Sequence, residues 1–159
     1  MRPTLSLLAL LAACAPAPAN PPSPPDPAAL KTAMDSIRTE YMRLAAAADA
    51  TGIAALYTED AAIDFFGAPK MRGRAEIEAG TKAAFSMQKP VMLEIVATQT
   101  SAIAPGLATE LGRFHGMDSV SGKVLHSWGR WISSARQDST GAWKLAYLMA
   151  FPDSQKTDK

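Results

Sequence analysis

Two histidines, an arginine and a tryptophan in the second half of the sequence are its best candidates for acid–base or anion-binding chemistry. His115 and His126 are the only histidines in the chain. A simple turn centred on residues 120–121 would place them directly across two antiparallel strands, about 5 Å apart at Cβ. Arg113 and Trp128 would neighbour them on the same face. This predicts a titratable pocket wall in which Arg113 binds a carboxylate and His115 carries protons. The alternative is a solvated patch on the outer face of a sheet.

The same part of the chain does not by itself make a metal or cofactor site. Two histidines lack the third protein ligand that a zinc site needs. The single cysteine, Cys14, excludes an internal disulfide and a cysteine-based zinc site. The sequence has no glycine-rich phosphate loop and no nucleophile elbow. We therefore expect no metal and no cofactor.

Asp64 and Tyr41 are two further polar residues in apolar surroundings. Asp64 lies within the segment AAIDFF at residues 61–66, where an apolar setting would favour its use as a general base. The alternative places Asp64 on the outer face of a strand, exposed to solvent. Tyr41 belongs to an apolar helical stripe, so it either packs in the core or presents its hydroxyl to a ligand.

Composition limits the class of protein. Of 159 residues, 48% are hydrophobic and 19% are charged, which is typical of a globular chain of one domain. Sixteen Lys and Arg against fifteen Asp and Glu give a formal net charge of +1. Because the chain is nearly neutral, it has no bulk electrostatic reason to bind nucleic acid, and we expect none as a partner.

The first residues read as an export signal. One arginine precedes a short apolar run that cannot span a membrane. The segment Leu11–Cys14 (LAAC) is similar to the lipobox of bacterial lipoproteins, in which the chain is cut before the cysteine and the cysteine is acylated. We expect residues 1–13 to be removed and lipidated Cys14 to anchor the protein in the cell envelope; the alternative is an ordinary secretory signal. Ala15 implies, by resemblance to Gram-negative lipoproteins, the periplasmic side of the outer membrane.

The elements that must position the candidate residues follow a proline-rich linker, residues 14–27, which favours an extended spacer. Asp26 and Pro27 form a helix start, and apolar residues at spacings of three and four then predict a helix. Asp49 caps a second, short helix. The predicted helices cover residues 27–48, a short segment after Asp49, and 74–87. The predicted strands cover 61–66, 91–98, 107–117, 124–135 and 143–151, with a flexible tail at 153–159.

Four segments in order resemble the nuclear transport factor 2-like superfamily, in the branch that contains SnoaL-like polyketide cyclases and ketosteroid isomerase. They are LYTEDAA at 56–62, RGRAEI at 72–77, GLA to GRF at 106–114, and GAWKL at 141–145. The resemblance covers a domain at residues 28–152. It implies an α+β fold, a cone in which N-terminal helices pack on a curved antiparallel sheet around a pocket.

The resemblance also implies roles for particular residues. Tyr41 falls on the oxyanion tyrosine of ketosteroid isomerase, but the base position falls on Phe65 and the second acid near Ser133, so that catalytic set is not retained. The resemblance also implies that Arg113 and His115 face the pocket together with residues 131 and 133. This strand register differs by one residue from the register that a simple turn at 120–121 would give. The expected pocket residues are Tyr41, Phe65, Arg113, Trp131, Tyr147, Met149 and Phe151.

These expectations lead to a protein that binds a small, largely apolar molecule. One alternative is an isomerase, cyclase or dehydratase that uses Asp64 or His115 for proton transfer. Another is an interaction module without chemistry, whose sheet face pairs two copies into a homodimer.

Overall fold

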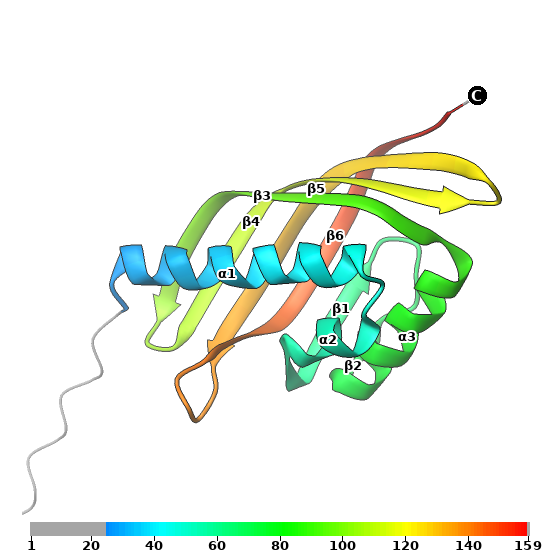
Figure 1. Cartoon of the computed structure of the whole chain (residues 1–159). Helices are drawn as coiled ribbons and strands as arrows, with labels where there is room; N and C mark the ends of the chain where they lie inside the picture. Colours follow the sequence, from blue (N-terminus) through cyan, green and yellow to red (C-terminus); the bar gives the residue numbers. More distant parts are fainter. Residues whose placement is uncertain (1–24, 159) are drawn as a thin grey trace, which may run out of the picture.

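The computed structural model describes residues 25–158, in which three helices lie against one face of a curved six-stranded sheet (Figure 1). This confirms the predicted α+β class. No helix in this part of the chain has the length and apolar character needed to cross a bilayer. The elements are α1 (Pro27–Ala46), α2 (Ala50–Ala55), β1 (Tyr57–Phe65), β2 (Met71–Arg72), α3 (Gly73–Met87), β3 (Lys89–Ala104), β4 (Leu107–Val120), β5 (Lys123–Gln137) and β6 (Trp143–Thr157).

The first two helices begin where their capping residues predict. The side chain of Asp26 accepts hydrogen bonds from the backbone N–H groups of Ala28 and Ala29, and Pro27 takes the first helical position. Asp49 caps α2 by accepting from the N–H of Gly52 at 2.8 Å. Each cap satisfies donors that have no partner inside the helix, which fixes where the helix starts.

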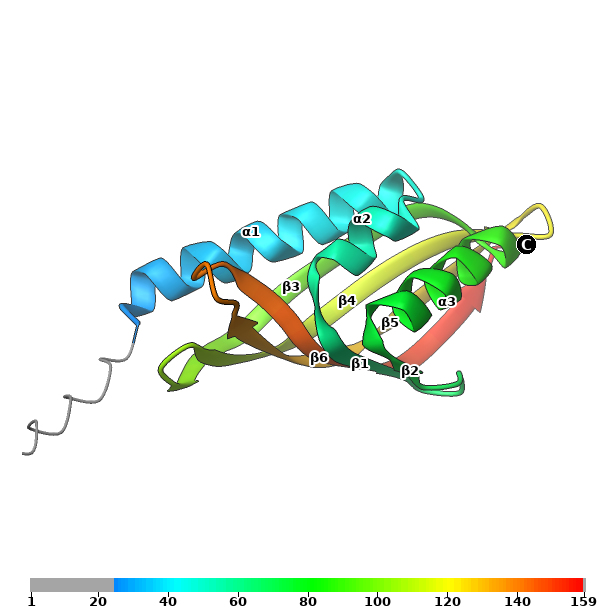
Figure 2. The same ribbon diagram turned by 90° about the horizontal axis from the view of Figure 1, so that it is seen from below.

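The sheet is mixed, which corrects the expectation of a wholly antiparallel sheet. Its strand order is β2-β1-β6-β5-β4-β3, and β1 runs parallel to β6 while the other pairs are antiparallel. The chain leaves β1 through β2 and α3 to reach the far edge, then returns through three hairpins to lie beside β1. Figure 2 shows the strands curving around the side on which the helices lie.

Several strand boundaries differ from the prediction; β3, for example, continues to Ala104 rather than ending at residue 98. β1 begins at Tyr57, four residues before the strand that was predicted at 61–66. β6 continues to Thr157, so the predicted flexible tail at 153–159 is wrong for residues 153–157. The reason is that β5 begins early enough to pair with this segment: Leu125 lies opposite Thr157 and Ser127 opposite Gln155.

The two faces of the sheet are distinguished by what α1 contacts. Leu30 and Met34 of α1 pack against Ala108 of β4 and Ala135 of β5, and we call this side the inner face. The pairing of β4 with β5 runs without a bulge from one end of β4 to the other. Alternate residues of these two strands therefore lie on the inner face, and those between them on the outer face.

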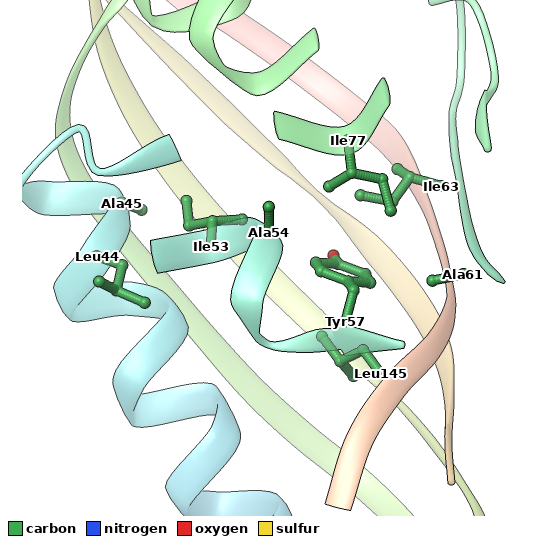
Figure 3. Packing of buried hydrophobic residues seen from close by; sticks show 9 residues of the cluster. All are labelled: Leu44, Ala45, Ile53, Ala54, Tyr57, Ala61, Ile63, Ile77 and Leu145. Carbon is green, nitrogen blue, oxygen red and sulfur yellow. The ribbon is translucent and has the colours of Figure 1, made fainter. Parts of the chain in front are cut away.

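The main core cluster lies among α1, α2, α3 and β1, with one residue from β6 (Figure 3). The ring of Tyr57 lies among these apolar side chains, close to Ala54 and Leu145 in the figure. The buried members of the cluster are Leu44, Ala45, Ile53, Ala54, Tyr57, Ala61, Ile63, Ile77 and Leu145.

Candidate functional site

Two tyrosine side chains place hydroxyl groups in the apolar core between the helices and the inner face of the sheet. Tyr57 is fully buried, and its hydroxyl has no hydrogen-bond partner within residues 25–158. Tyr41 of α1 is partly buried and packs against the same cluster. Burial raises the pKa of Tyr41. Burial, and then the neighbouring Tyr41, raise the pKa of Tyr57 well above its usual value. Both therefore stay neutral donors at physiological pH.

Phe65 and Trp131 also belong to the inner side. Phe65 follows the buried Ile63 by two positions on β1 and packs against the core cluster. Trp131 is 7% exposed, and its Nε1–H donates to the backbone oxygen of Arg113 at 3.1 Å. Tyr41, Phe65 and Trp131, three of the predicted pocket residues, are thus on one side of the sheet.

The other four predicted pocket residues lie on the outer face. Arg113 lies opposite Arg130, which lies opposite Phe151, and all three are exposed. A register shift in β6 after Leu145 turns Leu145 to the core, whereas Tyr147 and Met149 point outward. The predicted ligand-binding set is therefore divided between two faces rather than gathered around one pocket.

Asp64 and His115, the predicted proton carriers, also lie on the outer face and far from each other. Asp64 pairs with Lys70 at 2.6 Å and lies beside Met149 on the neighbouring strand. His115 is on β4, and strands β6 and β5 separate it from β1. The two residues do not share a site, and the sheet separates both from Tyr41.

The hairpin between β4 and β5 decides the register that the sequence left open. Its turn is Ser121–Gly122, with φ of 51° and 80°, a two-residue turn of the kind that suits a hairpin. His115 consequently lies opposite Trp128, and Met117 opposite His126. A turn at 120–121 would pair His115 with His126, so that prediction is wrong by two residues. A shift of two residues keeps each side chain on its face, so the two histidines still share one face of the sheet.

The register implied by the family resemblance, in contrast, is wrong by one residue. Trp131 and Ser133 are buried on the inner face, whereas Arg113 and His115 point outward. A slip of one residue exchanges the two faces of a strand, so this difference decides which groups can meet.

On the outer face the two histidines and Trp128 form a compact stack. Nε2 of His115 lies 3.2 Å from Nδ1 of His126, so the imidazoles are hydrogen-bonded. The ring of Trp128 is nearly parallel to both, with centroids 4.7 Å from His115 and 5.4 Å from His126. Nε2 of His126 lies 3.4 Å from a carboxylate oxygen of Asp158. Within residues 25–158 no three His, Cys, Asp or Glu side chains are grouped to hold a metal.

Glu110 is a buried carboxylate that the sequence analysis missed. It is 3% exposed on the inner face and accepts hydrogen bonds from Arg38 of α1 and Thr100 of β3. The sequence did contain a signal for its burial: Glu110 lies two residues from both Ala108 and Gly112, so all three share one face of the strand. The ion pair joins α1 to the sheet rather than forming a reaction centre.

Asp118 is a second inner-face carboxylate that the sequence analysis missed. Partial burial raises its pKa, and no hydrogen bond or ion pair to its side chain occurs in the described part of the chain. A carboxyl group whose pKa is raised by burial is a candidate for proton transfer. Asp118 is therefore better placed than Asp64 or His115 to act on a molecule at the inner face.

Replacing Asp118 with asparagine should stabilise the fold at pH 7 by up to about 0.5 kcal/mol, because solvent screens a half-exposed group. The raised pKa means that the folded state loses the proton at higher pH than the unfolded state. Stability is therefore lost as pH rises through the folded pKa, and protonation restores it below the unfolded value of 3.8. Urea unfolding at pH 7 and at pH 3 checks this: the variant's advantage should disappear at pH 3, and an equal advantage at both would contradict it.

Known proteins resemble this chain in both sequence family and fold. The family model of the SnoaL-like domain matches residues 28–148. No curated protein matches the sequence. A ketosteroid isomerase-like protein from Erwinia carotovora atroseptica is 18% identical, with a TM-score of 0.71 over 77% of this chain and 95% of the other.

Two further solved structures have the same fold. The hexachlorocyclohexane dehydrochlorinase LinA-type3 from Novosphingobium barchaimii is 10% identical, with a TM-score of 0.71 over 82% of this chain and 91% of the other. A nuclear transport factor 2-like protein with a cystatin-like fold from Novosphingobium aromaticivorans is 18% identical, with a TM-score of 0.62 over 77% and 81%. At such identities the likeness shows the fold alone.

Proposed function

We propose that this chain, which belongs to the SnoaL-like domain family, binds a small molecule at the inner face of its sheet. The molecule is largely apolar and carries one polar oxygen. The observation that carries this proposal is the buried Tyr57 hydroxyl without a partner, beside the hydroxyl-bearing Tyr41. A buried hydroxyl without a hydrogen bond costs about 1–3 kcal/mol. A ligand oxygen that accepts from this pair would offset that cost.

The surroundings of the two tyrosines support an apolar ligand body. Phe65, Phe85 and Leu93 are partly buried and pack against the core cluster, so they offer carbon surface and no competing acceptor. The raised pKa values keep both phenols protonated, so they donate to a carbonyl or hydroxyl oxygen rather than attract a cation.

Replacing either tyrosine of the pair with phenylalanine should weaken binding of 2-acetylnaphthalene and 2-naphthol by about three- to tenfold, the value of one neutral hydrogen bond. Tyr57→Phe should also raise the melting temperature of the free protein, since it removes an unsatisfied polar group. Calorimetric titration and thermal unfolding measure the two effects.

Tyr147→Phe is the matched control, because Tyr147 is the remaining tyrosine of the chain and lies on the outer face. It should change neither quantity. Failure of both probes to bind the unmodified protein, or equal losses in Tyr147→Phe, would refute the proposal.

A proton-transfer enzyme of the isomerase, cyclase or dehydratase kind is the alternative. A dehydrochlorinase has a similar fold, although its sequence identity of 10% to this chain assigns no role to any residue. Asp64 and His115 would have to act on a molecule at the outer face. A reaction at the inner face would instead depend on Asp118, whose raised pKa suits a general base.

We further propose that the protein acts outside the cytoplasm, lipid-anchored through Cys14, as the segment Leu11–Cys14 suggests. Cys14 lies outside the described residues. Homodimer formation through the outer face also stays a prediction. Apolar side chains exposed on that face support it, namely Leu111, Ile132 and Phe151.

A further inference from the structure

We propose that a groove across the outer face of the sheet binds a short, linear, uncharged oligosaccharide, with the indole of Trp128 as its stacking platform. The groove has a volume of about 310 Å³. It lies on the opposite side of the sheet from Tyr41 and Tyr57, so it does not depend on the binding function proposed above.

The groove is formed by two neighbouring rows of side chains that cross the strands. Glu94, His115 and Trp128 lie opposite one another in the first row. Val96 and Arg113 lie opposite each other in the second row. Asp153 closes the β6 end of the groove. Because adjacent strands are about 4.8 Å apart, a groove that crosses β3 to β6 is about 14 Å long. This shape suits a chain of linked rings better than a single compact molecule.

Trp128 is held in position before any ligand binds. Its ring lies nearly parallel to the hydrogen-bonded imidazoles of His115 and His126, at interplanar angles of 9° and 14°. Trp128 is nevertheless 37% exposed and lines the groove. An aromatic ring fixed in this way offers a flat apolar surface at a low entropic cost of binding. The carbon face of a pyranose ring is a flat apolar surface that can pack against it.

The charges along the groove favour a neutral, hydroxyl-rich ligand. Glu94 and Arg113 make no ion pair in the described part of the chain and present one acceptor and one donor group. Asp153 is neutralised by a two-pronged bond from Arg130, with donor–acceptor distances of 2.8–3.1 Å. Sugar hydroxyls donate and accept, so they can satisfy both kinds of group. An anionic ligand would be repelled by the carboxylate of Glu94. An apolar ligand would desolvate the guanidinium of Arg113 without replacing its hydrogen bonds to water.

The test is calorimetric titration of the full-length protein with cellotetraose, maltotetraose and chitotetraose. At least one should bind, and Trp128→Ala should weaken that binding by about tenfold or more. Trp128→Phe, which keeps an aromatic surface, should lose less. Trp143→Phe is the control, because Trp143 packs on the inner side beside α1, and its affinity should match that of the unmodified protein.

Three results would overturn the proposal. The first is absence of binding for all three probes at millimolar concentration. The second is unchanged affinity in Trp128→Ala, with the fold verified by its melting temperature. The third is binding of tetragalacturonate, an acidic probe, without binding of any uncharged one.

Discussion

Replacing Arg38 with methionine should lower the free energy of unfolding by about 3–5 kcal/mol, because it leaves the carboxylate of Glu110 buried without its counter-ion. Glu110 is 3% exposed, and the side chain of Arg38 is 14% exposed, so water cannot replace the lost partner. Methionine keeps most of the volume of the arginine side chain, which limits the effect of packing.

The contacts of Glu110 explain why this pair matters to the fold. One carboxylate oxygen accepts hydrogen bonds from Arg38 of α1 and Thr100 of β3, while Glu110 itself lies on β4. Asp35 also bonds to Arg38 and holds the guanidinium in place. The network thus joins α1 to two strands, and its loss should loosen the helix that carries Tyr41.

Urea denaturation measures the effect, with Arg43→Met as the matched control. Arg43 pairs with Glu40 on the same helix, but the two side chains are 61% and 42% exposed, so we expect a change below about 1 kcal/mol. The double variant Arg38→Met with Glu110→Leu should recover much of the loss, since a buried ion pair can be replaced by apolar groups. A loss below about 1 kcal/mol in Arg38→Met would show that Glu110 does not need its partner.

Local signals in the sequence predicted the elements well. Asp26 with Pro27, and Asp49, are caps whose effect depends on neighbours within one turn, so their position along the chain is sufficient information. Alternation of apolar residues likewise located the four long strands. Their ends were less predictable, because residues 153–157 become a strand only by pairing with the start of β5.

The candidate site was predicted less well, because face assignment depends on single-residue details of register. The positive φ at Ser121 set the β4–β5 hairpin, and the irregularity after Leu145 turned Tyr147 and Met149 outward. Neither feature has a strong sequence signal. Glu110 and Asp118 were missed for a different reason. The alternation of a strand shows which residues share a face, but it does not show which of the two faces the helices cover.

Replacing Cys14 with serine should move the protein from the membrane fraction almost entirely to the soluble fraction. Serine keeps the size of the side chain but offers no thiol for acylation. Each buried methylene of an acyl chain contributes about 0.8 kcal/mol, and several chains make an anchor effectively permanent. The variant should also keep residues 1–13, because cleavage at a lipobox follows lipidation of the cysteine. Fractionation with immunoblotting, and mass spectrometry of the N-terminal peptide, measure both effects.

Ala17→Ser is the matched control, since it makes a similar change three residues further along, in the proline-rich segment, and should alter neither location nor cleavage. A wash in 1 M salt distinguishes a lipid anchor from adsorption, because salt at about 1 M shortens the screening length to roughly 3 Å. Acyl chains in a bilayer do not respond to salt. A net charge of +1 gives little electrostatic attraction to begin with. Release of the unmodified protein by the wash, or retention of Cys14→Ser in the membrane, would therefore contradict the anchor.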